Sequence, residues 1–172
     1  TPTPAAVPSA TPLATPTPTP LPTATATPTP TPIPTATVPV VLQVLVEPAQ
    51  VQLALGASTT LTIVLTGAQK GLSGYDLTIA LEPTGVAEIV EVSFPDFGLT
   101  RTSAVPSASV SILIADLNRR VEPAAGAQTL ATLRITVRST GTASITIQVK
   151  AMDDEQGGGM SPQVRGAKIT GG

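Results

Sequence analysis

Three consecutive acidic residues, Asp153, Asp154 and Glu155, are the residues of this chain best suited to binding a metal ion. Calcium prefers clustered carboxylate oxygens, and the flexible Gly157 follows closely, so this stretch could hold calcium. The spacing differs from that of an EF-hand loop, and a solvated acidic turn is the favoured interpretation. We therefore expect no cofactor and keep calcium as the only candidate metal.

A second pair of carboxylates, Glu88 and Glu91, has the residue type that glycoside hydrolysis uses. An odd spacing on a strand places two side chains on opposite faces, so these residues are predicted to be surface charge. Serine-based catalysis would need a base, but the chain contains no histidine. It also lacks a Gly-x-Ser-x-Gly elbow. The sequence predicts no catalytic residues and no enzyme.

The aromatic residues are few: Tyr75, Phe94 and Phe97. The two phenylalanines share the segment Phe94-Pro95-Asp96-Phe97-Gly98, which could be a docking spot on a loop or a plug for the core. Both interpretations stay open at this point. A surface that stacks on sugar rings needs exposed aromatics, so carbohydrate binding is the weaker functional interpretation.

Composition argues against two further classes of function. The formal net charge is −2, and the nine Lys and Arg residues are scattered apart from Arg119-Arg120, so nucleic-acid binding is not predicted. There is no cysteine, which excludes disulfides and thiolate metal sites. No apolar run reaches the ~20 residues that a spanning helix needs, so no membrane span is expected.

Short β-strands must position these residues, because Val, Ile, Leu and Thr alternate repeatedly after residue 40. Turn residues separate the runs into eight or nine strands, and the stretch from Phe94 to Ser107 is expected to be irregular. The expected fold is all-β, an antiparallel β-sandwich of jelly-roll type over residues 39–172. The inward-facing residues are predicted to include Leu61, Ile63, Leu65, Tyr75, Leu77, Ile79, Leu81, Val110, Ile112, Ile114, Leu133, Ile135, Val137, Ile145, Ile147 and Val149.

Residues 1–38 have a different character, since they contain only Thr, Pro, Ala, Val, Leu, Ile and Ser. Proline fixes φ near the polyproline II value, so the segment is predicted to be an extended stalk of up to roughly 120 Å. Threonine interleaved with proline is typical of O-glycosylated stalks, and a plain linker is the alternative. This composition predicts a secreted or cell-surface protein whose export signal has been removed before Thr1. The glycosylation candidates are Thr15, Thr17, Thr19, Thr27, Thr29 and Thr31.

The uncharged run from Val40 to Val46 follows the stalk directly. It could add to the open sheet edge of a neighbouring copy. The alternative is pairing within its own sheet, because sequential strands usually lie side by side. The candidate assembly residues are Val40, Val41, Leu42, Val44, Leu45 and Val46.

Several segments between residues 40 and 170 resemble a cohesin-type module. They are GLSGYDLTIALEP (Gly71 to Pro83), GAQTLATLRITV (Gly126 to Val137), GTASITIQV (Gly141 to Val149) and VRGAKIT (Val164 to Thr170). Glu82-Pro83 stands where the family usually has Asp-Pro. Cohesins are similar in fold to carbohydrate-binding modules, and they bind dockerins in assemblies that degrade polysaccharide. The resemblance therefore implies a sandwich fold and a dockerin-type partner.

Two functional hypotheses follow. In the first, which the sequence favours, the chain is a secreted structural subunit whose copies assemble into an extracellular or cell-surface filament with a glycosylated stalk. In the second, it is a cohesin-like binding module that recruits a dockerin-type helical partner. The expected partners are therefore copies of the chain itself or a dockerin-like protein, with covalent glycans on the stalk.

Overall fold

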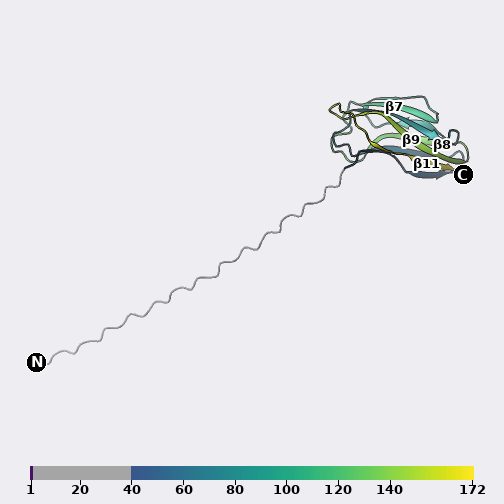
Figure 1. The fold of residues 1–172 in the computed structure, drawn as a ribbon. Helices are drawn as coiled ribbons and strands as arrows, with labels where there is room; N and C mark the ends of the chain where they lie inside the picture. The colour runs from purple at the N-terminus through teal and green to yellow at the C-terminus, as the bar shows by residue number, and fades with distance from the viewer. Residues whose placement is uncertain (2–39) are drawn as a thin grey trace. The chain divides into compact units, whose positions relative to one another are not determined.

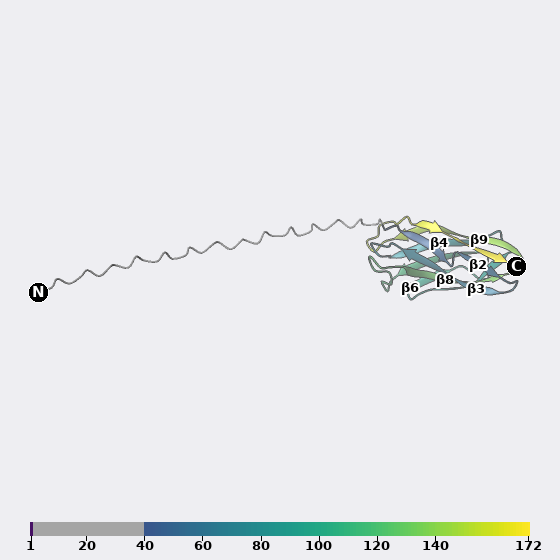
Figure 2. The same cartoon turned by 90° about the horizontal axis from the view of Figure 1, so that it is seen from below.

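The computed structural model describes Thr1 and residues 40–172, which form eleven strands (Figures 1 and 2). Among these residues, no helix is long and apolar enough to cross a membrane. The predicted stalk and its six candidate glycosylation sites lie outside the described residues, apart from Thr1. The strands are β1 (Gln43–Glu47), β2 (Gln50–Leu53), β3 (Ser58–Thr66), β4 (Gly74–Glu82), β5 (Ala87–Ser93), β6 (Gly98–Thr102), β7 (Ser109–Asp116), β8 (Gln128–Val137), β9 (Gly141–Asp153), β10 (Gln163–Arg165) and β11 (Ala167–Gly171).

Two sheets pack face to face and confirm the predicted all-β sandwich. The five-stranded sheet has the order β10-β1-β3-β8-β5, and the six-stranded sheet has the order β2-β11-β9-β4-β7-β6. Alternate side chains of the central strands meet between the sheets, and almost all of the predicted inward-facing residues are buried there. Val149, which is half-buried, packs against this core.

Tyr75 and Phe97 are the two aromatic residues inside the core. The Tyr75 hydroxyl donates a hydrogen bond of 2.6 Å to the Leu130 carbonyl, and the two rings meet edge to face with their centroids 6.1 Å apart. Burial, together with the nearby charge of Asp116, raises the pKa of the Tyr75 hydroxyl. Phe97 is fully buried, which decides between the two interpretations of its segment in favour of the core plug.

Two strand pairs are parallel, which corrects the prediction of a wholly antiparallel sandwich. β1 pairs in parallel with β10 in one sheet, and β2 pairs in parallel with β11 in the other. The two parallel pairs are formed by the same two segments of the chain. One segment passes from β1 to β2 through Pro48-Ala49, and the other passes from β10 to β11 through Gly166. Both segments therefore cross between the sheets side by side, a feature we call the paired crossing.

The prediction of eight or nine strands was too low for two physical reasons. The paired crossing divides the C-terminal segment into two strands, β10 and β11. β6 lies in the stretch predicted to be irregular, and all five of its residues are exposed. A strand held only by backbone pairing to β7 has no alternating apolar pattern to reveal it.

The candidate assembly strand pairs within its own sheet in this structure. β1 lies between β3 and β10, and Val44 and Val46 are buried in the core. Val40 and Val41 are exposed just before β1. An assembly role for this strand stays a prediction.

Gly166→Ala should destabilise the paired crossing. A Cβ at this position would collide with the Ile145 carbonyl oxygen, which is backbone and cannot move away easily. Overpacking of this kind costs about 1–3 kcal/mol, measured as the free energy of unfolding in urea. Gly126→Ala is the matched control, because a Cβ there meets nothing within 4 Å. Equal stability of the two variants would contradict this account of the crossing.

Candidate functional site

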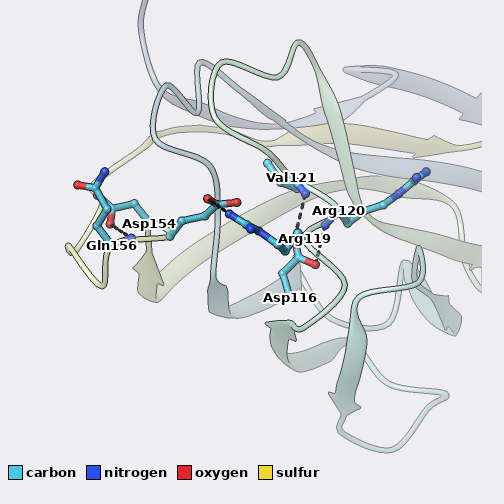
Figure 3. A network of polar contacts seen from close by, with 7 residues as sticks. Asp116, Arg119, Arg120, Val121, Asp154 and Gln156 are labelled. Atoms are coloured by element: carbon cyan, nitrogen blue, oxygen red, sulfur yellow. Dashed lines mark hydrogen bonds and ion pairs between the residues drawn. The ribbon is translucent and has the colours of Figure 1, made fainter.

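The acidic stretch after β9 forms a turn closed by Asp154. Its side chain is buried, and its Oδ1 accepts a hydrogen bond from the backbone N–H of Gln156 (2.9 Å; Figure 3). The backbone N–H of Gly158 donates a second hydrogen bond to the same oxygen (2.8 Å). The ammonium of Lys70 lies 3.6 Å from Oδ2. The hydrogen bond from Gly158 is the main reason that the pKa of Asp154 is lowered, against the opposing effect of its desolvation.

A second turn, after β7, is closed by Asp116 in the same manner. Asp116 accepts hydrogen bonds from the backbone N–H groups of Arg120 (2.8 Å) and Val121 (2.9 Å). Arg119 projects from this turn and binds Glu155 of the other turn, with 3.0 Å between Nη2 and Oε2 (Figure 3). Hydrogen bonding to Glu155 raises the pKa of Arg119. The two turns are thus joined into one polar network, which we call the loop clamp.

The predicted calcium candidates do not converge on one point. Asp154 closes its own turn, Glu155 faces Arg119, and Asp153 ends β9 with an exposed side chain. Within residues 40–172, no three carboxylate, histidine or cysteine side chains are placed to hold a metal ion. The solvated-turn interpretation also needs correction, because Asp154 is 3% exposed. The geometry indicates a structural role for this stretch.

Glu88 and Glu91 lie on the same face of β5, so the prediction of opposite faces was wrong. A register shift between Ile89 and Glu91 adds a residue to the strand and restores the even alternation. Both carboxylates pair with arginines in or directly after β8, Glu88 with Arg138 (2.9 Å) and Glu91 with Arg134 (3.7 Å). They are partly exposed surface charges, as predicted.

The outer face of the six-stranded sheet carries an apolar patch at its β6–β7 corner. Leu99, Leu113 and Leu117 are 55%, 47% and 69% exposed. Leu113, Ala115 and Leu117 alternate along and just beyond β7, and Leu99 of β6 pairs with Ala115. The Leu117 N–H continues the strand pairing by donating to the Phe97 carbonyl at 2.7 Å. We call Leu99, Leu113 and Leu117 the leucine corner.

The rest of this outer face is polar, with hydroxyl and amide side chains beside charged residues such as Arg101 and Lys150. Thr78 and Ser111 face each other across β4 and β7, with their hydroxyl oxygens 3.4 Å apart. Gln148 and Thr146 of β9 pair with Thr78 and Ala80 of β4. Exposed apolar groups gathered at one corner of such a face are typical of an interaction surface.

The leucine corner is not predicted from the sequence above, although the sequence contains one signal for it. Leu113 stands between Ile112 and Ile114, so three large aliphatic residues follow one another on a single strand. Side chains alternate between the faces, so when Ile112 and Ile114 enter the core, Leu113 must face out. Leu99 and Leu117 gave no comparable signal.

The five-stranded sheet carries an open groove of about 820 Å³. Leu45 and Val64 supply aliphatic surface there, and Thr60, Thr62 and Thr129 supply hydroxyls. Glu47 and Arg165 are its charged residues. This set includes no arrangement of nucleophile and base.

Comparison with known proteins identifies the fold. No protein-family model matches the chain, and no curated protein sequence matches it. The cohesin of the Clostridium thermocellum Coh-OlpA–Doc918 complex matches with a TM-score of 0.63 and 15% identity, over 76% of this chain and 99% of that one. A non-cellulosomal cohesin from the archaeon Archaeoglobus fulgidus matches with a TM-score of 0.63 and 14% identity, over 77% and 91%. The seventh ScaB type I cohesin from Pseudobacteroides cellulosolvens matches with a TM-score of 0.61 and 14% identity, over 77% and 92%.

These matches confirm that this chain contains a cohesin-like β-sandwich module. The first of the three is a cohesin bound to a dockerin, and another matching structure from Acetivibrio cellulolyticus is a cohesin in complex with a Cel5 dockerin variant. At 13–15% identity, the shared property is the fold.

Asp154→Asn should lower the free energy of unfolding at neutral pH and flatten its acid dependence. A carboxylate with a lowered pKa contributes stability fully above its unfolded pKa of about 3.9 and loses that contribution as the pH falls through its folded value. The wild type should therefore converge on the variant in urea titrations as the pH falls below about 4. Asp153→Asn is the matched control. Parallel pH profiles for wild type and Asp154→Asn would contradict the role of the carboxylate.

Proposed function

We propose that residues 40–172 form a non-catalytic, cohesin-like binding module that docks a dockerin-type helical partner on the leucine corner. The proposal is supported by the cohesin-like fold and by the dockerin complexes among the matching structures. The observation that carries it is the exposure of three leucines on one corner of an otherwise polar sheet face. Apolar anchors surrounded by polar surface are the usual composition of a protein interface.

The leucine corner lies on a surface of the module that is ordered before the partner binds. Leu113 lies on β7, which is paired on both sides, with β4 and with β6. A sheet surface of this kind is already ordered before binding, so association requires little ordering of the module itself. A helix that lays one apolar stripe across the corner would bury all three leucines.

The filament hypothesis, which the sequence favoured, is replaced here by the binding-module hypothesis. The matching structures support recruitment of a dockerin and give no support to a homopolymer. β1, the strand proposed for assembly, is already paired with two neighbours. Sugar binding also loses its support, because Tyr75 and Phe97 are buried and Phe94 is half-buried.

Residues 1–38 fit this proposal as a spacer. An O-glycosylated Thr-Pro segment outside the cell would hold the module at a distance from the structure to which the chain is attached. The candidate glycosylated positions are the six threonines named above, and the proposed location is extracellular or at the cell surface. Intact mass of natively produced protein tests the modification, since mass equal to that of the bare chain contradicts it.

Leu113→Ser and Leu99→Ser should each weaken dockerin binding at least tenfold, mainly through faster dissociation, because buried apolar anchors govern k_off. The measurement is surface plasmon resonance on the full chain, with binders selected from a display library in which the exposed helix positions of a dockerin are randomised. Leu55→Ser is the matched control, because Leu55 is 60% exposed and lies outside the corner. Unchanged affinity of the two corner variants, or an equal loss for Leu55→Ser, would contradict the assigned surface.

A further inference from the structure

Two cations and one carboxylate lie on the strands that flank Leu113, at one end of the leucine corner. Strand register places Arg101 of β6 opposite Leu113 of β7, and Asp76 of β4 opposite Leu113 on its other side. Asp76 is paired in turn with Ala151 of β9, the residue after Lys150. A single row therefore crosses four neighbouring strands, from the β6 edge of the sheet to β9.

These residues line a shallow cleft of about 270 Å³. Arg101, Lys150 and Asp76 supply its charges, and Leu113 supplies its exposed apolar surface. Thr102, Ser103 and Ser111 add hydroxyl groups to the wall. The cleft is large enough for a side chain and offers it several hydrogen-bond donors.

The charges in this cleft are not satisfied by ion pairs in the described part of the chain. The four ion pairs there use Lys70, Arg119, Arg134 and Arg138 as their cations. Arg101, Lys150 and Asp76 take part in none of these four ion pairs. The cleft is therefore locally positive by one charge, although the chain as a whole is negative by two.

We infer that the docking surface of the partner carries an Asp or Glu beside its apolar anchor, placed to reach Arg101 and Lys150. The inference rests on the proposed function and specifies the chemistry of the partner. A guanidinium binds a carboxylate through two parallel hydrogen bonds, and the ammonium of Lys150 adds a second positive charge. Asp76 favours a single acidic residue there, because it would repel a second carboxylate placed over β4.

The two parts of the surface are expected to act on different rate constants. Exposed charges at the rim of an interface steer the approach of the partner, so they affect association and its salt dependence. The leucines are buried only after docking, so they affect dissociation. This difference separates the charge inference from the proposed function.

The test uses the full chain and the dockerin-type binders selected on it as above. Arg101→Glu with Lys150→Glu should lower k_on about tenfold or more and flatten its dependence on salt, with little change in k_off. Lys168→Glu is the control for one such charge reversal, because it changes the net charge by −2 on β11, outside the cleft, against −4 for the double variant. Selected binders should carry an acidic residue, and its replacement by Lys should restore association with the double variant.

The outcomes distinguish the two claims. Binders that are weakened by the leucine variants but associate equally fast with Arg101→Glu/Lys150→Glu overturn the charge inference and leave the proposed function standing. Binders indifferent to the leucine variants overturn the proposed surface. Failure to recover any binder from the library contradicts both claims, and circular dichroism of each variant checks that its fold is retained.

Discussion

The interlocking of aliphatic side chains between two sheets is the interaction on which the rest of this structure depends. Packed sheets lie about 10 Å apart, so the residues of each inner face must fill that space without large voids. Here Val, Leu and Ile supply most of the core, together with several alanines and Met152, and Tyr75 and Phe97 are its only aromatic residues. With no disulfide in the chain, this burial has to outweigh the entropy lost by ordering the strands.

The loop clamp joins the turn after β7 to the turn after β9. Asp116 closes the turn that begins with Leu117, and Arg119 ties that turn to Glu155 after β9. The ends of β7 and β9 are thereby held together next to the leucine corner. A cluster of carboxylates that resembles a metal site in sequence thus joins two turns, in three dimensions, beside the proposed docking surface.

Much of the sandwich could be predicted from alternation alone, because a residue such as Ile79 or Leu133 reveals its strand and its face together. Features that depend on backbone geometry could not be predicted from this alternation. The extra residue in β5 reverses the expected relation of Glu88 and Glu91, and β6 pairs without any buried side chain. The leucine corner could be predicted only in part. Leu113 stands between two inward-facing isoleucines, so the sequence indicates that it faces out, whereas Leu99 and Leu117 are recognised only when the fold places them beside it.

The paired crossing has a mechanical consequence. Leu42 accepts a hydrogen bond from Gln163 at the start of the first parallel pair, and Gly172 donates one to Leu53 at the end of the second. Tension applied between residue 40 and Gly172 would slide β1 against β10 and β2 against β11, which loads many hydrogen bonds at once instead of opening them one by one. A module anchored at one end and loaded at the other would resist unfolding under pulling force through these two short pairs.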